Sequence, residues 1–274
     1  MTIGQAAALG GLQGLTEFLP ISSSGHLVLA NALLRSLGGK APGAEDQLPL
    51  AFVVLVHAGS LVAIVAFFWR EFLSLLTTRR RLIGMLVVGT IPAGIAFVIL
   101  KAVEHLSGAD VMGALFERPL PVGIALLVTG AVLWVGEGRE EGRTTLDGVR
   151  WSDGWWVGVA QAVAIVPGIS RSGMTITAGL ARGLERRTAV AFAFLLGAVA
   201  IAAGTVVELK DFERLGGRLG LGVLATGFAV SAAASLGALA LLSVVVRRKR
   251  LRVFAAYCFA VGGASILANL LGLW

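Results

Sequence analysis

The chain has 274 residues, of which 57% are hydrophobic and 14% are charged, whereas a soluble domain carries about a quarter charged residues. The apolar residues form long blocks without strict alternation, which excludes a soluble globular domain and a transmembrane β-barrel and predicts membrane-spanning helices. The formal charge of +7 comes from short basic runs between these blocks. Such runs are typical of segments that fix membrane orientation, so we expect no nucleic-acid partner.

The first apolar stretch, residues 3–19, ends in a helix break. Pro20 follows it, and three serines and a glycine occupy positions 22–25. Proline stops a helix, and serine is a good N-cap for the next one. Non-helical backbone at membrane depth persists only where it is buried in protein or lines a wet cavity. The stretch therefore predicts a re-entrant hairpin of two short helices that enters and leaves the membrane on one side.

Three apolar blocks follow, each close to the roughly 20 residues that a bilayer crossing takes. They lie near 50–69, 83–103 and 120–137. A charged linker, 138–150, ends this half of the chain.

A second interrupted stretch opens the other half. Residues 155–166 end at Pro167 and Gly168, which predicts a second re-entrant hairpin for the same reasons. Three more blocks complete the chain. They lie near 188–208, 219–246 and 253–273.

The two interrupted stretches look like copies of each other. A shift of 148 residues aligns Gln13 with Gln161, Ser22 with Ser170, Ser24 with Ser172, and Gly25 with Gly173. Three spans follow each hairpin, and because three is odd, the repeats 1–137 and 151–274 must have opposite orientation. We expect one transmembrane domain, 1–274: an all-α integral membrane protein with six transmembrane helices and two re-entrant hairpins in two inverted-topology repeats. In this architecture the functional site lies where the broken helices meet.

The charges of the connecting segments predict the orientation. Segments 70–82, 182–187 and 247–252 are net positive, and 35–49, 104–118 and 208–218 are neutral or negative. The segment 137–153, which contains the linker, is a mild exception, because it is net negative at the positive end. The positive-inside rule places the basic end in the cytoplasm. Both termini and the first hairpin then face outward.

Polar residues gather at the two breaks. A charge at the centre of an inserting helix costs ~2.5–3.5 kcal/mol, so we expect Glu17 and Arg171 to face a shared cavity. Gln13 lies one helical turn before Glu17, and His26 one turn after Ser23. Each second half-helix starts at its break, and free N–H groups at such a start bind phosphate. An arginine fork also suits phosphate oxygens, so the pattern predicts a phosphoryl-group site.

Structural alternatives stand beside this interpretation. Glu17 and Arg171 could form an ion pair that only locks the repeats together, and any single serine could serve only as a helix cap. We interpret His57 and His105 as structural, because both lie in or near apolar spans.

Two segments resemble a known family. The run from Gly14 to His26 reads Gly-Leu-Thr-Glu-Phe-Leu-Pro-Ile-Ser-Ser-Ser-Gly-His, and the run from Pro167 to Thr175 reads Pro-Gly-Ile-Ser-Arg-Ser-Gly-Met-Thr. Both are similar to the signature segments of the undecaprenyl-diphosphate phosphatase family, also called the bacitracin-resistance family. Their order, separation and membrane setting match, and the span pattern extends the resemblance over essentially the whole chain.

The resemblance implies hydrolysis of undecaprenyl diphosphate to undecaprenyl phosphate and inorganic phosphate. This reaction recycles the lipid carrier for peptidoglycan and confers bacitracin resistance. It further implies a multi-pass protein of the bacterial inner membrane with a site open to the outer face, and a divalent cation such as Mg²⁺ or Ca²⁺. Glu17 and Gln13 are the candidate metal ligands. The family motif has Glu or Gln at position 13, and Gln13 removes one carboxylate from such a site.

The sequence supports one preferred mechanism. Ser23 attacks the terminal phosphorus, His26 takes its proton, Glu17 orients His26 or holds a metal ion, and Arg171 neutralises the phosphoryl oxygens. The expected substrate-binding residues are Gln13, Ser22, Ser24, Ser170, Ser172 and Thr175. In a rival assignment His26 attacks directly and forms a phosphohistidine.

A lipid-phosphate transporter or flippase is the alternative function, because inverted repeats with broken helices are a transporter layout. The sequence leaves open the nucleophile, the metal, the preferred prenyl length, a homodimer, and lipid flipping as a second activity.

Overall fold

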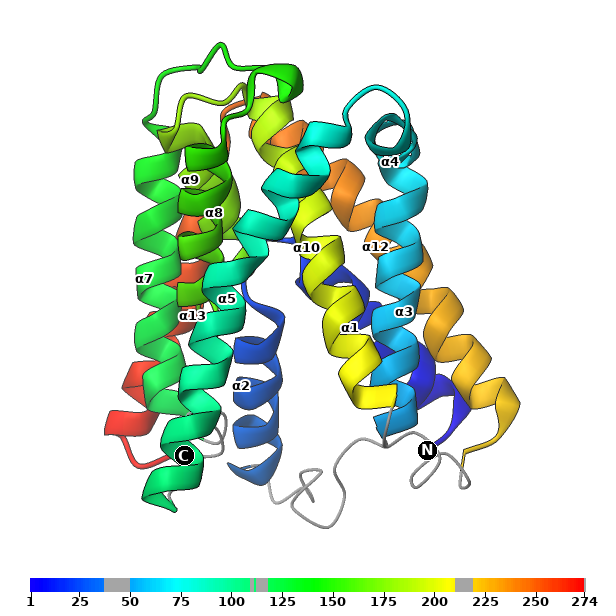
Figure 1. Cartoon of the computed structure of the whole chain (residues 1–274). Coiled ribbons are helices and arrows are strands. Elements are labelled where there is room, and N and C mark those ends of the chain that lie inside the picture. Colours follow the sequence, from blue (N-terminus) through cyan, green and yellow to red (C-terminus); the bar gives the residue numbers. More distant parts are fainter. Residues whose placement is uncertain (37–49, 109–110, 112–117, 210–218, 274) are drawn as a thin grey trace.

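The computed structural model describes residues 1–36, 50–108, 111, 118–209 and 219–273. In these ranges most of the chain is helical (Figure 1). The one β-type contact in the described part is an isolated parallel bridge between Thr144 and Leu184. Within the described ranges, five helices are long and apolar enough to cross a membrane, and a bent pair adds a sixth candidate span. The chain is thus an all-α integral membrane protein, as the composition predicts.

The two halves have a similar order of helices, except that α4 of the first half has no counterpart among the described helices of the second. The first half contains α1 Ile3–Phe18, α2 Ser23–Ser36, α3 Leu50–Phe67, α4 Trp69–Leu76, α5 Arg80–Ser107 and α7 Pro119–Glu137. The second half contains α8 Trp151–Val163, α9 Arg171–Ala181, α10 Arg186–Leu209, α12 Leu221–Arg247 and α13 Arg252–Leu270, after a 3₁₀ turn at Leu146–Gly148. Each half begins with two short helices separated by a break and continues with long helices.

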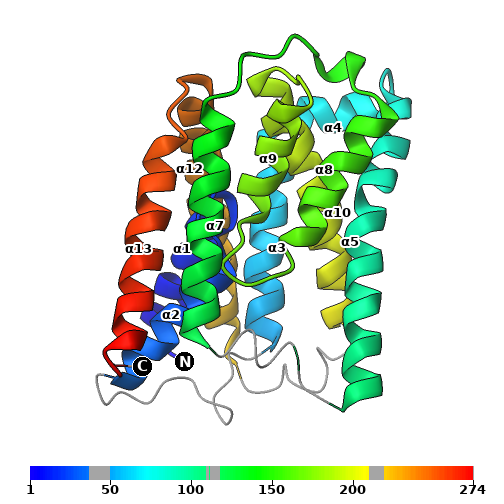
Figure 2. The ribbon, with the colours of Figure 1, turned by 90° about the vertical axis from the view of Figure 1, so that its left-hand side faces the viewer.

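The two hairpins enter from opposite ends of the molecule. Helices α1 and α2 occupy the end where both termini lie, and α8 and α9 occupy the end of the linker (Figures 1 and 2). This is the inverted arrangement that the odd number of spans predicts.

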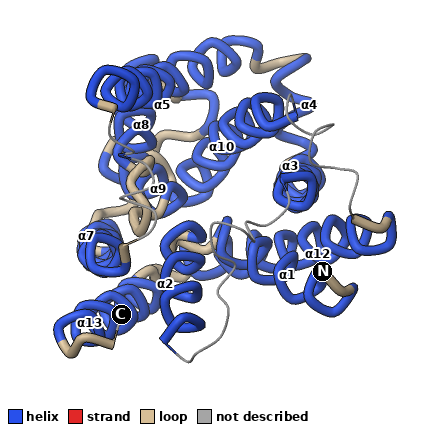
Figure 3. Tube along the Cα trace, turned by 90° about the horizontal axis from the view of Figure 1, so that it is seen from below, coloured by secondary structure: helices blue, strands red, loops and turns tan. Residues whose placement is uncertain are grey.

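Helices of one half pack on helices of the other. Seen end-on, α1 lies beside α12, and α13 lies close to α7 (Figure 3). A Cβ on Gly10 would lie 2.6 Å from the carbonyl oxygen of Gly227, and one on Gly14 would lie 2.4 Å from that of Ser231. Small residues let membrane helices approach this closely. The hydroxyl of Ser60 also lies 3.2 Å from that of Ser231, so α3 joins the same contact.

Helix α4 is an element that the sequence interpretation missed. The span expected at 50–69 ends at Phe67, and the chain bends by 77° into α4. Trp69, Leu73 and Leu76 are exposed along α4, whereas Leu75 is buried. An amphipathic helix at this angle to a span is typical of one that lies in the membrane interface.

The linker is held at the same end as α4. Arg79 Nη2 donates to Asp147 Oδ2 at 2.8 Å, and this hydrogen bond, together with the charge of Arg79, lowers the pKa of Asp147 below its usual value. Arg182 Nε donates to Asp153 Oδ1 at 2.8 Å and fastens the end of α9 to the start of α8. These contacts fix the base of the second hairpin.

The two helix breaks touch each other in the interior. A Cβ on Gly25 would lie 2.9 Å from Gly168 Cα, and Gly168 has a φ of +93° that favours glycine. Gly168 N–H donates to Ser22 Oγ at 3.1 Å, and Thr129 Oγ1 donates to the Gly168 carbonyl at 2.8 Å. Because their backbone groups are satisfied by protein, these irregular segments can lie at membrane depth.

Candidate active site

Three helix ends deliver the polar side chains of the interior. Gln13 and Glu17 lie on the last turns of α1, Ser23 is the first residue of α2, and Arg171 is the first residue of α9. The 148-residue shift that relates the repeats aligns Ser23 with Arg171 and Glu17 with Ile165. The two hairpins therefore supply different chemistry from equivalent positions: a hydroxyl and a carboxylate from the first, and a cation from the second.

Glu17 is the centre of the cluster. Its Oε1 accepts a hydrogen bond from Arg171 Nη2 at 2.5 Å, and its Oε2 accepts from Ser23 Oγ at 3.0 Å and from Gln13 Nε2 at 3.1 Å. The side chains of Glu17 and Arg171 are 11% and 19% exposed. A pair of opposite charges with this little exposure offsets its desolvation only through close contact and further hydrogen bonds, and both are present here.

Helix α10 makes room for the guanidinium. A Cβ on Gly197 would lie 2.2 Å from Arg171 Nη1, so any side chain at this position would displace the arginine. The sequence interpretation did not single out Gly197, because one glycine among 37 carries no signal until the fold brings Arg171 against it.

His57 also belongs to the cluster, although the sequence interpretation treated it as structural. Gln13 Nε2 lies 3.1 Å from His57 Nε2. The same amide nitrogen faces a Glu17 oxygen, so it must be the donor, and His57 Nε2 must accept. His57 Nδ1 then donates to the Val53 carbonyl at 3.0 Å. The available signal was an ionisable residue inside a span, which is functional by default. His105 lies exposed near the end of α5.

His26 turns away from Ser23. Its Nδ1 lies 2.7 Å from the Ser22 carbonyl and its Nε2 lies 2.8 Å from the Tyr257 hydroxyl. The His26 and Tyr257 rings stack with centroids 5.5 Å apart. One ring nitrogen is thus engaged by Ser22 and the other by Tyr257 on α13, and the hydrogen-bond partner of the Ser23 hydroxyl in this arrangement is Glu17. The expected proton path from Ser23 to His26 stays a prediction.

The remaining candidate residues mainly order the two breaks. Ser22 Oγ accepts from Gly25 N at 3.3 Å as well as from Gly168 N, and Ser170 Oγ caps α9 by accepting from Gly173 N at 3.2 Å. Thr175 Oγ1 donates to the Arg171 carbonyl at 2.8 Å. The hydroxyls of Ser24 and Ser172 lie 3.4 Å and 3.2 Å from those of Ser22 and Ser170. Among these five residues, Ser22, Ser24 and Ser170 also line a cavity.

Two adjoining cavities share the ion pair. One, of about 180 Å³, is lined by Glu17 and Arg171 together with Ser22, Ser23, Ser24 and Ser170. The other, of about 220 Å³, is lined by Glu17, His57 and Arg171 and by the α10 segment from Ala200 to Thr205. The buried hydroxyl of Thr205 has no hydrogen-bond partner within the described ranges. The second cavity lies toward the end of the molecule that holds the termini, because α10 runs in that direction (Figure 1).

The donor set does not fit a cation held by the protein alone. Both oxygens of Glu17 already accept hydrogen bonds, and Gln13 turns its amide nitrogen toward Glu17. Across the described residues, no three His, Cys, Asp or Glu side chains are grouped as ligands. The guanidinium of Arg171 takes the place next to the carboxylate that a metal ion would need.

Comparisons of the sequence with known proteins all find the same family. The sequence model of the family described as bacitracin resistance protein BacA matches residues 6–264. An undecaprenyl-diphosphatase of Methanosphaera stadtmanae is 35% identical, over 98% of this chain and 99% of the relative. An undecaprenyl-diphosphatase of Rhodopirellula baltica is 38% identical, over 94% of this chain and 95% of the relative. One of Carboxydothermus hydrogenoformans is 35% identical, over 98% of this chain and 98% of the relative.

Proposed function

Because this chain belongs to the bacitracin resistance protein BacA family, we propose that it hydrolyses undecaprenyl diphosphate to undecaprenyl phosphate and inorganic phosphate. This reaction regenerates the lipid carrier for cell-wall synthesis and confers bacitracin resistance. One observation carries the proposal: inside the membrane, Ser23 Oγ donates to a carboxylate that also binds Arg171. A transporter needs only donors for its cargo, whereas hydrolysis needs a nucleophile next to a base, so this arrangement favours the phosphatase over the flippase.

Glu17 is the base in the proposed mechanism. Its Oε2 takes the proton of Ser23 as Oγ attacks the terminal phosphorus. The new bond joins Oγ to phosphorus, the bridging P–O bond breaks, and undecaprenyl phosphate leaves with the bridging oxygen. The bridging oxygen takes the proton from Glu17, which restores the carboxylate. Water then attacks the phosphoserine, Glu17 takes a proton from the water and passes it to Ser23 Oγ as the P–Oγ bond breaks, and inorganic phosphate is released. Both steps keep protons and charge within one hydrogen-bonded set.

Arg171 and the helix starts stabilise the transferring group. A phosphoryl transition state spreads negative charge over its equatorial oxygens. The guanidinium and the free N–H groups at the starts of α2 and α9 supply positive charge there. His26 supports the site through Ser22, because its ring nitrogen holds the carbonyl of the residue that precedes Ser23. Ser22 itself has a φ of +69°, a conformation that costs free energy unless its surroundings fix it.

An apolar groove is suited to the prenyl tail. It has a volume of about 920 Å³ and lies between α1, α2 and α13, with His26 on its wall. Its lining includes Leu12, Leu29, Leu33 and Val261. Each buried CH₂ group of a tail contributes about 0.8 kcal/mol. The tail can therefore stay in this groove while the diphosphate reaches Ser23.

The divalent cation and the membrane orientation complete the proposed function. A requirement for Mg²⁺ or Ca²⁺ is best met by an ion that arrives bound to the diphosphate, because the protein donors do not surround one. The positive-inside rule supports the inner membrane with the site open to the outer face.

Release of inorganic phosphate from undecaprenyl diphosphate by the purified protein tests the function. We expect multiple turnovers for the native protein and a kcat about 10²–10⁴ lower for Glu17→Gln, which cannot accept the proton of Ser23. Glu140→Gln, a change at an exposed linker carboxylate, is the control and should retain full activity. Chelator should abolish release, and added Mg²⁺ or Ca²⁺ should restore it. Binding of the lipid without phosphate release would instead favour a transporter.

A further inference from the structure

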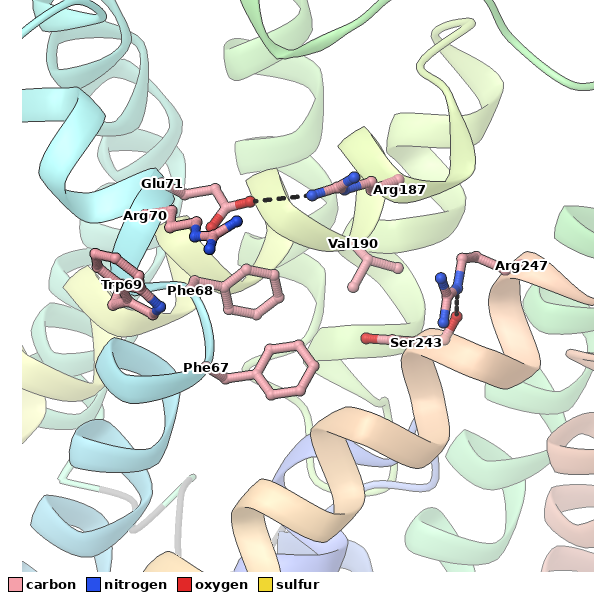
Figure 4. A pocket seen from close by; sticks show the side chains of 9 residues that line it. All are labelled: Phe67, Phe68, Trp69, Arg70, Glu71, Arg187, Val190, Ser243 and Arg247. Atoms are coloured by element: carbon pink, nitrogen blue, oxygen red, sulfur yellow. Dashed lines mark hydrogen bonds and ion pairs between the residues drawn. The ribbon is translucent and has the colours of Figure 1, made fainter.

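A third polar cavity lies outside the active site, at the end of the molecule opposite the termini. It has a volume of about 400 Å³ and lies where α3 bends into α4, where α10 begins and where α12 ends (Figure 4). Its lining includes Phe67, Phe68, Arg70, Glu71, Arg187 and Arg247. The rings of Phe67 and Phe68 point into the space between α3 and α12 (Figure 4).

The charge in this cavity is unbalanced. Three guanidinium groups come from three different helices, and Glu71 is the one carboxylate in the lining. Glu71 Oε1 reaches Arg187 Nη2 only at 3.8 Å. Arg70 lies over the Trp69 ring at 5.3 Å, and Arg247 Nε donates to the Ser243 carbonyl at 3.2 Å. Each arginine has five N–H donors, so these contacts leave most donors available to an anion.

The positive-inside rule explains basic residues at this end of the protein but not their convergence. Arg80, Arg248 and Arg250 are exposed at the same end and line none of the described cavities. Arg79 is paired with Asp147 on the linker. Arg70, Arg187 and Arg247 are exposed as well, but they line one cavity, and a planar fork suits phosphate oxygens better than a solvated lysine would.

The position of the cavity points to lipid headgroups. Helix α4 crosses the direction of α3 at 77° and exposes Trp69 and Leu73 beside the cavity, which is the behaviour of a helix at the membrane interface. Anionic lipids attract basic groups at this depth. The aromatic floor of Phe67 and Phe68 offers apolar contact to the glycerol and upper acyl chain of such a lipid.

The cavity is separate from the catalytic cluster. Phe68 stacks on Phe194 with centroids 5.9 Å apart, and Phe194 meets Phe18 edge-on at 5.5 Å. All three rings are buried, and Phe18 is the residue after Glu17. A ligand in this cavity would therefore contact neither Ser23 nor Arg171.

We propose that this cavity binds the phosphate of an anionic phospholipid from the leaflet at this end of the protein. The lipid phosphate bridges Arg70 on α4, Arg187 on α10 and Arg247 on α12, and so holds the α3–α4 bend against the second half of the chain. This site is independent of the hydrolysis, and either activity can exist without the other.

Native mass spectrometry of the purified protein in neutral detergent, titrated with phosphatidylglycerol, tests this site. We expect one tight binding event, which the combined variant Arg70→Gln, Arg187→Gln, Arg247→Gln weakens by roughly tenfold or more. The combined variant Arg80→Gln, Arg248→Gln, Arg250→Gln removes the same charge from the same end and should bind as the native protein does. If the first variant does not fold, the single variant Arg247→Gln should still weaken binding severalfold.

Three outcomes would overturn the proposal. Equal weakening in the two combined variants would mean that general surface charge attracts the lipid. Equal binding of phosphatidylcholine would mean that the negative charge of the headgroup does not matter. Competition by millimolar inorganic phosphate would assign the cavity to a free anion. Phosphate release from undecaprenyl diphosphate, measured in parallel in neutral detergent, should be the same for all variants that fold.

Discussion

Replacing Ser23 with alanine is expected to lower kcat for phosphate release by at least about 10³-fold, because loss of a nucleophile leaves only the catalysis that binding and charge stabilisation supply. The hydroxyl of Ser23 is the one that donates to Glu17. Ser24→Ala should have a smaller effect, because Ser24 Oγ contacts another serine at the edge of the hydrogen-bonding range. Ser152→Ala is the control, because Ser152 lies at the start of α8, the end of this helix away from the break. It should have the kcat of the native protein.

Rapid acid quenching during turnover with labelled substrate provides the second readout for Ser23. We expect acid-stable label on a serine in the native protein and none in Ser23→Ala. Acid-labile label on His26 together with near-native turnover of Ser23→Ala would remove Ser23 as the nucleophile. That result would also require His26 to leave Tyr257, because both of its ring nitrogens are engaged in the present geometry.

Replacing Arg171 with alanine is expected to lower kcat by about 10²–10³-fold, the cost of losing a donor to developing negative charge, ~2.7–4 kcal/mol. Stability should fall as well, because breaking a buried ion pair costs about 3–5 kcal/mol, and Glu17 would lose its closest partner. Arg171→Lys should recover only part of the activity, since a point charge cannot reproduce the two-pronged fork. The measurements are steady-state kinetics and thermal unfolding in detergent.

Arg143→Ala, which removes an exposed charge of the linker, is the control for Arg171. Full activity in Arg171→Ala would exclude the arginine from the transition state. A loss of stability with full activity would leave Glu17–Arg171 as the purely structural ion pair that is the alternative interpretation of these two charges.

The architecture could be predicted from the sequence because its causes are local. Pro20 and Pro167 lie in the two breaks, after α1 has ended at Phe18 and α8 at Val163, and block length sets the number of spans. Helix α4 could not be predicted in this way. Its apolar residues, Leu73 and Leu76 among them, lie between basic runs that make the segment resemble a loop.

The site could be predicted only in part. The cost of a charge inside the membrane predicts that Glu17 and Arg171 face a shared cavity, and in the structure they form an ion pair. Spacing predicts His26 as the hydrogen-bond partner of Ser23, but the structure gives Glu17. Spacing could not show this, because the orientation of the His26 ring depends on Tyr257, which lies 231 residues after His26. His57 joins Gln13 through contact between α1 and α3. A lone histidine in an apolar block does not reveal such a contact, since it depends on how two helices pack.

A double-mutant cycle tests most directly whether the two hairpins form one catalytic unit. Phosphate release would be measured for Glu17→Gln, Arg171→Ala and the double variant. Groups that act together in one site show strongly non-additive losses. We predict that the double variant is no slower than the slower single variant. A double variant whose loss equals the product of the two single losses would contradict a shared site built from both halves of the chain.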